Sequence, residues 1–226
     1  MNLSSTGGVA LLGAGQVANE LALLWAAAGV PVTVWGPSPD RVDWLIEDTL
    51  EQHPGAPLFR AASAEEAVAG HAVLVPAVPW GDPLNRLLTS LAPFLPGRCV
   101  LDVSNPFEMT ALGPKQAMYV PFGSAGAGTA SVLPDGTGHV HALSQVRADA
   151  MGAGARSHAL APYVSNRVHD AGAVAAVAAT GWVPVRVGDV EASALVEAAG
   201  PWALSRGTAG LGALNEAEAR ATGLLR

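Results

Sequence analysis

Gly13-Ala14-Gly15-Gln16-Val17-Ala18 is the stretch of sequence that decides the fold. It follows the apolar run Val9-Ala10-Leu11-Leu12, and apolar side chains recur at helical spacing after it. In a strand–turn–helix unit with this G-x-G-x-x-A pattern, Gly13 permits the tight turn, Gly15 lets a pyrophosphate approach the backbone, and Ala18 lets the helix pack against the strand. The stretch therefore predicts a dinucleotide site that includes Gly13, Ala14, Gly15, Gln16 and Val17, at a helix N-terminus with free N–H groups. The alternative is a small-residue turn that only packs a helix on a sheet.

The composition excludes several classes of protein. The 226 residues suffice for one large α/β domain or a domain with a smaller lobe. A net charge of −7 argues against a nucleic-acid partner, which would need a basic surface. Mean hydropathy is +0.32, yet no apolar run reaches the ~18 residues of a membrane span, so we expect no membrane partner. With the single Cys99 and no signal-peptide pattern, the sequence predicts a cytoplasmic location.

Short apolar runs predict the rest of the sheet. Runs at 30–35, 58–60, 72–75 and 99–103 are typical of buried parallel strands, and helical patterns separate them, among them Asp82 to Leu91. This alternation predicts a Rossmann-type, doubly wound, mostly parallel sheet of six or more strands with a C-terminal α/β extension. We expect residues 1–120 to form the nucleotide-binding domain and residues 121–226 to complete the sheet and the substrate cleft.

The tip of the second strand indicates which dinucleotide binds. An NAD site usually has an acidic residue about twenty residues after the glycine turn, but this strand is followed by Gly36-Pro37-Ser38-Pro39-Asp40-Arg41. Ser38 can bond a 2′-phosphate and Arg41 can neutralise it, so we prefer NADP to NAD. The alternative is that Asp40 binds the ribose and Arg41 is a solvated helix charge.

Two further loops follow predicted strands. Pro76-Ala77-Val78-Pro79-Trp80 is rigid because of its prolines, and in this fold such a loop passes beneath the nicotinamide, which makes Ala77, Val78 and Pro79 cofactor-binding candidates. Ser104-Asn105-Pro106 follows the strand at 99–103. Asn105 can bond the carboxamide or a ribose, or it can form an Asx-type turn before the proline.

Together, residues 13–18, Ala77-Val78-Pro79-Trp80 and Asp102-Val103-Ser104-Asn105-Pro106 resemble the F420-dependent NADP reductase family. Looser similarity continues through 123–134, 139–144, 168–171, 181–185 and 195–197. The resemblance implies an enzyme, an oxidoreductase that transfers a hydride between NADP(H) and coenzyme F420, with the C-terminal segments walling the deazaflavin cleft. It also implies that the strand at 139–144 borders the cleft, which adds Ala142 to the cofactor-binding candidates.

Three departures leave a second reading open. Ala192 and Ala194 stand where the family has Asn and Arg, and Ser144 stands where it has Asn or His. The chain could instead be an NADPH-dependent reductase of a small organic imine or carbonyl compound. A third reading is a non-catalytic NADP-binding sensor.

An organic-substrate reductase needs a proton donor near the nicotinamide. The catalytic candidates are His141 and Tyr163, with Tyr119 and His169 behind them. The alternative for His141 is a partly buried ring bonded to a backbone carbonyl, and for Tyr163 a half-buried aromatic. His53, His139 and His158 share no metal-ligand spacing, so we expect no metal.

The C-terminal sequence is apolar. We expect helices from Val190 to Ala199 and from Trp202 to Leu214, which could form a homodimer contact or another protein interface. The expected partners are therefore a small-molecule substrate or F420 and a second copy of the chain.

Overall fold

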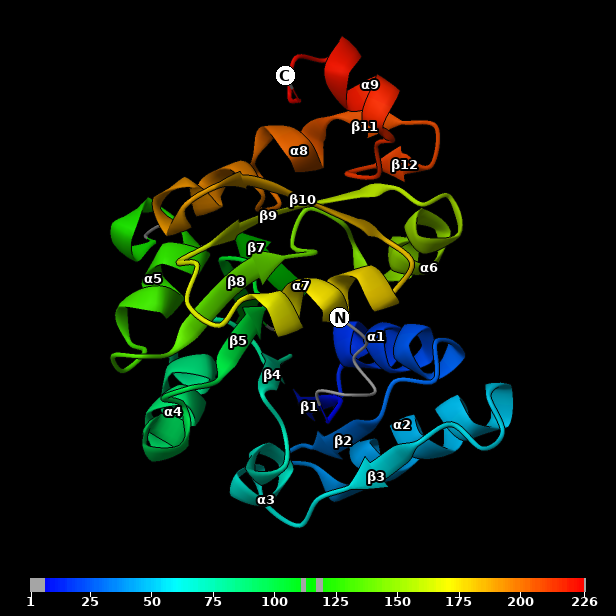
Figure 1. Cartoon of the computed structure of the whole chain (residues 1–226), viewed down its shortest axis with the longest axis vertical. Helices are drawn as coiled ribbons and strands as arrows, with labels where there is room; N and C mark the ends of the chain where they lie inside the picture. The colour runs from blue at the N-terminus through cyan, green and yellow to red at the C-terminus, as the bar shows by residue number, and fades with distance from the viewer. Residues whose placement is uncertain (1–6, 111–112, 117–119, 226) are drawn as a thin grey trace.

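The computed structural model describes residues 7–110, 113–116 and 120–225 (Figure 1). Its main sheet has eight strands in the order β10-β9-β8-β5-β4-β1-β2-β3. All neighbouring pairs are parallel except β8 and β9. The predicted Rossmann-type, mostly parallel sheet is confirmed. The strands are β1 (Val9–Leu12), β2 (Val32–Trp35), β3 (Leu58–Arg60), β4 (Val73–Pro76), β5 (Cys99–Asp102), β8 (Gly138–Ala142), β9 (Leu160–Ser165) and β10 (Val183–Gly188).

The N-terminal half of the sheet has the order 3-2-1-4-5, which reverses between β1 and β4. Such a reversal leaves a crevice at the carboxyl ends of the strands, where ligands bind in open α/β sheets. The five strands expected here are confirmed, although β2 begins at Val32 rather than at residue 30. The connecting helices are α1 (Gln16–Ala27), α2 (Pro39–Gln52), α3 (Ala64–Ala69) and α4 (Asp82–Leu91).

The C-terminal half adds three strands to the β5 side of the same sheet (Figure 1). The helices α5 (Ala125–Ser131), α6 (Ala148–Arg156) and α7 (Ala171–Ala179) connect or flank them. Before α5, β6 (Phe107–Thr110) and β7 (Gly113–Gln116) form a separate antiparallel hairpin. In the described part of the chain, the short 3₁₀ helix η2 (Ala92–Phe94) follows α4, and two more, η3 (Pro121–Gly123) and η4 (Val190–Leu195), lie in the C-terminal half.

The expectation of two long C-terminal helices is wrong. After η4 the described part of the chain forms α8 (Pro201–Leu204), the strands β11 (Arg206–Gly207) and β12 (Gly210–Leu211), and α9 (Glu216–Ala221). Gly200 precedes a proline, which disfavours the helical conformation at that residue. Gly210 and Gly212 have φ values of +121° and +71°, which a helix does not contain.

Apolar packing on both faces of the sheet holds the helices in place. Trp25 on α1 is fully buried, and its indole N–H donates to the carbonyl of Ala176 on α7 over 2.9 Å. The indole N–H of Trp182 likewise donates to the carbonyl of Met151 on α6 over 3.0 Å. These bonds satisfy large buried side chains and join elements that are far apart in sequence. Among the described residues, no helix has the length and apolar character that crossing a membrane requires.

Candidate functional site

The glycine turn after β1 is packed tightly against the end of β4. Gly13 has a φ of +137°, and a Cβ added there would lie 2.3 Å from the carbonyl oxygen of Ala77. The Gly13 N–H donates to the carbonyl of Trp35 over 2.7 Å, and the Ala77 N–H donates to that of Leu12 over 2.8 Å. Gly13 is therefore required by the close approach of two chain segments, and the turn is tied to β2 and β4 alike.

Gly15 lies on the open side of the same turn. It is the N-cap residue of α1, and no side chain caps this helix end. A Cβ added at Gly15 would meet nothing within 4 Å, and both Gly15 and Gln16 are exposed, whereas Ala18 is buried against the sheet. The turn thus leaves free space in front of a helix N-terminus that lacks acidic residues in its first turn. This arrangement fits a pyrophosphate.

The tip of β2 lies beside this turn. A Cβ added at Gly36 would lie 3.6 Å from the Cβ of Ala14. Ser38 is the N-cap residue of α2, and its side chain makes no capping hydrogen bond. Arg41 is exposed, and within the described part of the chain its guanidinium has no ion pair. A hydroxyl and a cation therefore lie next to the glycine turn, and the assignment of a 2′-phosphate to them stays a prediction.

The other candidate cofactor contacts follow β4, β5 and β8. Val78 is half-buried and Pro79 is exposed after β4, and Ala142 is fully buried at the end of β8. The side chain of Asn105 is held by protein groups: its Nδ2 donates to the carbonyl of Ser144 and its Oδ1 accepts from the Ala198 N–H, both over 2.8 Å. One N–H of the Asn105 amide remains for a ligand, so its cofactor role stays a prediction.

The proton-donor candidates lie in different environments. Tyr163 is half-buried on β9, in register with Ala142, and burial raises the pKa of its phenol. His169 is exposed beside the start of α7 with a φ of +49°, and Tyr119 lies outside the described residues. His141 has no exposed surface and belongs to a buried polar cluster. Tyr163 is therefore the candidate with a partly accessible side chain at the end of β8.

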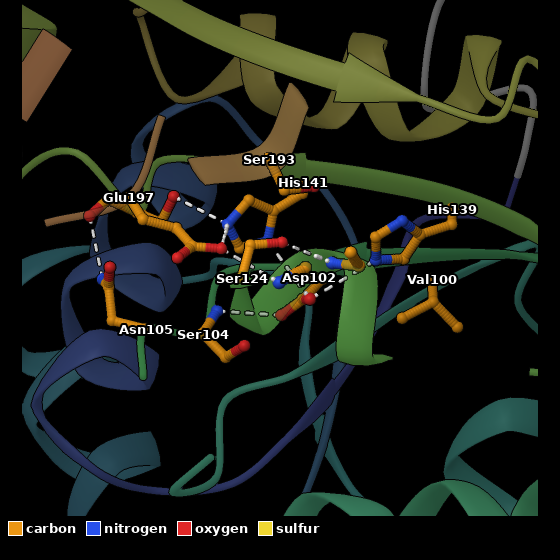
Figure 2. Close-up of polar contacts among 12 residues, drawn as sticks. Val100, Asp102, Ser104, Asn105, Ser124, His139, His141, Ser193 and Glu197 are labelled. Atoms are coloured by element: carbon orange, nitrogen blue, oxygen red, sulfur yellow. Dashed lines mark hydrogen bonds and ion pairs between the residues drawn. The ribbon is translucent and has the colours of Figure 1, made fainter. Parts of the chain in front are cut away.

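Three side chains of this cluster converge between β5 and β8 (Figure 2). Asp102 is the register partner of His141 on the neighbouring strand, and His139 lies two residues earlier on the same face. The Asp102 Oδ2 lies 3.1 Å from Nδ1 of His141 and 3.3 Å from Nε2 of His139. Its Oδ1 accepts from the Ser104 N–H over 2.9 Å. The carboxylate is thus buried with partners on both oxygens.

A fourth side chain, Glu197, approaches His141 from the segment after η4. Its Oε1 lies 3.7 Å from Nε2 of His141 and accepts from the Gly126 N–H over 3.1 Å (Figure 2). The Ser144 hydroxyl lies 3.0 Å from the same Nε2 and donates to the carbonyl of Val196 over 2.8 Å. The imidazole of His141 therefore lies between two carboxyl groups that come from different parts of the chain.

The charges of this cluster are coupled. Burial opposes ionisation of Asp102, but the charge of His141 and hydrogen bonds from both histidines outweigh it and hold the pKa of Asp102 well below its usual value. Burial likewise opposes protonation of His141, yet Asp102 and then Glu197 raise its pKa. Burial raises the pKa of Glu197, with His141 acting against it. The cluster thus favours an Asp102 carboxylate paired with a His141 imidazolium.

Sequence spacing did not reveal this cluster. His139, His141 and Asp102 offer donor atoms that all lie within 4.8 Å of one another, a set that could hold a metal ion. A comparison of histidine spacings along the chain misses it, because the carboxylate comes from the neighbouring strand. One pattern in the sequence does point to the cluster. His139 and His141 are two residues apart on one strand and therefore share a face, and the neighbouring strand ends in Asp102. A single oxygen of Asp102 lies close to both rings, so the three groups already pair with one another without an ion.

Comparison with known proteins agrees with the turn geometry. Residues 8–106 match the model of the family described as NADP oxidoreductase coenzyme F420-dependent. A glycerol-3-phosphate dehydrogenase [NAD(P)+] from Desulfotalea psychrophila is 34% identical over 100 residues. That match covers 42% of this chain and 29% of the relative, so the chain shares only a part of that protein.

Solved structures share the fold over most of the chain. A putative F420-dependent NADP reductase from Arthrobacter sp. FB24 is similar with a TM-score of 0.66 and 22% identity, over 82% of this chain and 86% of that one. An imine reductase from Bacillus cereus is similar with a TM-score of 0.60 and 18% identity, over 81% of this chain and 55% of that one. The fold is therefore that of an NAD(P)-binding Rossmann protein. The sequence similarity to the NADP oxidoreductase, coenzyme F420-dependent, family lies within residues 8–106, which are less than half of the chain.

Proposed function

We propose that this protein binds NADP(H) along the carboxyl ends of β1, β2, β4 and β5 and transfers a hydride between the nicotinamide and a second bound substrate. The observation that carries the proposal is the open space at Gly15 in front of the uncapped N-terminus of α1. It lies in the segment whose sequence matches an NADP oxidoreductase family. Gly15, Gln16 and Val17 would bind the pyrophosphate through backbone N–H groups at the start of α1, while Gly13 and Ala14 would shape the turn that lets it approach.

The chemistry of the β2 tip supports NADP over NAD. Ser38 and Arg41 offer a hydroxyl and an exposed guanidinium beside the turn, and a 2′-phosphate would accept hydrogen bonds from both. Asp40 in the same helical turn would disfavour a bound phosphate, but its charge is solvent-exposed and therefore screened. NADPH should consequently bind more tightly than NADH.

Coenzyme F420 is our first choice for the second substrate. Hydride transfer between two rings needs stacking at short distance and exclusion of water rather than a protein acid or base. The residues after β4, Ala77, Val78 and Pro79, would support one face of the nicotinamide, with the prolines keeping that loop rigid. The family that matches residues 8–106 supports this choice.

Tyr163 favours a second candidate, the reduction of a small organic imine or carbonyl compound. Its half-buried phenol lies beside Ala142 at the end of β8, and a tyrosine carries its proton at neutral pH. A group of this kind could deliver the proton that reduction of an imine or carbonyl requires. The fold shared with an imine reductase is compatible with this reading.

One titration series tests both candidates. NADPH and NADH are titrated against the protein by intrinsic fluorescence, and NADPH should bind with the lower Kd. The NADPH complex is then mixed with F420 while the deazaflavin absorbance is followed. Rapid loss of that absorbance supports the F420 reaction. Binding without conversion, followed by NADPH oxidation with a cyclic imine, supports the second candidate, and failure to bind either nucleotide overturns the proposal.

A further inference from the structure

Residues 196–198 are tied to the ends of β5 and β8 by bonds from three consecutive residues. The carbonyl of Val196 accepts from the Ser144 hydroxyl, and the Ala198 N–H donates to Oδ1 of Asn105, each over 2.8 Å. Between them, the carboxyl group of Glu197 enters the buried cluster. We call residues 196–198 the strap. It connects the C-terminal part of the chain to the edge of the sheet where ligands bind in this fold.

Glu197 is the only member of the strap with an ionisable side chain, and it is 4% exposed. Its Oε1 accepts from the Gly126 N–H on α5 and faces Nε2 of His141. α5 lies close against this group, because a Cβ added at Gly126 would lie 2.9 Å from Cγ of His141. Burying a carboxyl group is costly unless partners compensate it. The position of the strap is therefore coupled to the imidazole between Glu197 and Asp102.

The same bonds orient Asn105. Its amide oxygen accepts from the strap, and its nitrogen donates to the carbonyl of Ser144, the residue whose hydroxyl also contacts His141. Leu143, just before Ser144, is held at a φ of +58°, an uncommon conformation for a non-glycine residue that the surrounding contacts must maintain. The strap thus contacts the segments that follow β5 and β8, in addition to the pairing of the two strands themselves.

We propose that Glu197 is a positioning residue for the nicotinamide end of the NADP site, acting through His141 and the strap on Asn105 and the end of β8. The proposal rests on the proposed function, because it assigns the nicotinamide to these strand ends. Glu197 touches no ligand in this scheme. The adenosine end of the site, formed by the turn after β1 and the tip of β2, is independent of it.

The test compares two ligands on matched variants. NADPH reports on the whole site, whereas 2′,5′-ADP occupies only its adenosine end. Glu197→Gln keeps an oxygen for the Gly126 N–H and removes the charge that faces His141. Glu191→Gln, at an exposed position on η4, removes the same charge without entering the cluster. Affinities are measured by calorimetry for the full-length protein.

We expect Glu197→Gln to weaken NADPH binding about tenfold and to leave 2′,5′-ADP binding within twofold of the wild-type value. Glu191→Gln should change neither. Equal weakening of both ligands by Glu197→Gln, or no change in either, would overturn the positioning role. If the wild-type protein binds both 2′,5′-ADP and NADPH, such a result for Glu197→Gln contradicts only the role of Glu197. A wild-type protein that binds neither ligand contradicts the proposed function.

Ser144→Ala provides a second variant if Glu197→Gln does not fold. It removes the hydroxyl that joins the His141 ring to the carbonyl of Val196. The same selective loss of NADPH affinity is expected, and an unchanged ratio of the two affinities would contradict the proposal.

Discussion

The α carbon of Gly13 faces the carbonyl oxygen of Ala77 so closely that an added Cβ would lie 2.3 Å from that oxygen. Two strands of the sheet, β1 and β4, meet at this point, and both ends of the contact are backbone. Neither side can give way without moving a strand end. The closeness of this contact explains why the first glycine of the turn is a requirement of folding rather than of binding.

Gly13→Ala should therefore destabilise the protein by about 2–4 kcal/mol, through steric overlap in addition to an unfavourable φ. Urea unfolding measures the change. Gly97→Ala is the matched control, because Gly97 has a φ of +80° but nothing within 4 Å of an added Cβ, so it should lose only about 1 kcal/mol. Equal losses in the two variants would show that the contact with Ala77 is not responsible.

Gly15→Val should have the opposite profile. The φ of Gly15 is −95° and its Cβ direction is open, so we expect the free energy of unfolding to fall by only about 1 kcal/mol, the difference between glycine and valine at a helix N-cap. The valine would fill the space assigned to the pyrophosphate, and NADPH binding should fall below detection in a fluorescence titration. A folded Gly15→Val variant that binds NADPH normally would refute the placement of the phosphates.

Arg41→Ala tests the 2′-phosphate assignment. Loss of a charge-assisted contact should raise the Kd for NADPH about tenfold or more and barely change the Kd for NADH. Arg86→Ala on α4 is a suitable control. Arg86 is also exposed, and its substitution removes the same charge at a place away from the tip of β2. Equal loss of affinity for NADPH and NADH would mean that Arg41 acts through a general electrostatic effect and does not contact a 2′-phosphate.

The N-terminal half of the fold could be predicted because its signals are local. Gly13 and Gly15 stand between an apolar strand and a helix, and the start of α3 is likewise a local feature, because the Glu66 N–H donates to the hydroxyl of Ser63 three residues earlier. The C-terminal segment differs from its predicted helices because Gly200-Pro201, Gly210 and Gly212 interrupt a stretch whose apolar composition favours helix.

The buried cluster could not be predicted for a different reason. Asp102 and His139 are 37 residues apart, and Glu197 joins from a segment whose fold was not foreseen. Their meeting depends on β8 pairing with β5 in one register. A shift of one residue would turn the histidines to the other face of the sheet. Tertiary pairing decides this site, and no pattern within a short window encodes it.

Asp102→Asn should reveal the charge state of the cluster through pH. His141 is faced by Asp102 on β5 and by Glu197 of the strap, and His139 shares the Asp102 carboxylate. The raised pKa of His141 gives stability that is fully present below its unfolded value and is lost as pH rises through the folded value. The lowered pKa of Asp102 gives stability that is present above its own unfolded value.

The cost of Asp102→Asn should therefore be largest, about 3 kcal/mol, between the unfolded pKa values of the aspartate and the histidine, near pH 5–6. This cost should shrink as pH rises through the folded pKa of His141, because a neutral imidazole no longer gains from the negative charge of Asp102. Urea unfolding of both proteins from pH 5 to 9 measures the difference. A cost that does not change with pH would mean that His141 is neutral in the wild-type protein.

Cys99 provides a final test of the core beneath the cluster. Its side chain is fully buried on β5, and burial, with a smaller contribution from Asp170, raises the pKa of the thiol to about 12. The thiolate is the reactive form, so the native protein should not react with an aromatic disulfide reagent at pH 8. In denaturant, each protein molecule should release one equivalent of the reagent's coloured thiol. Since the sequence contains a single cysteine, the signal has one source. Rapid labelling of the native protein would mean that β5 opens frequently or that its packing between β4 and β8 is wrong.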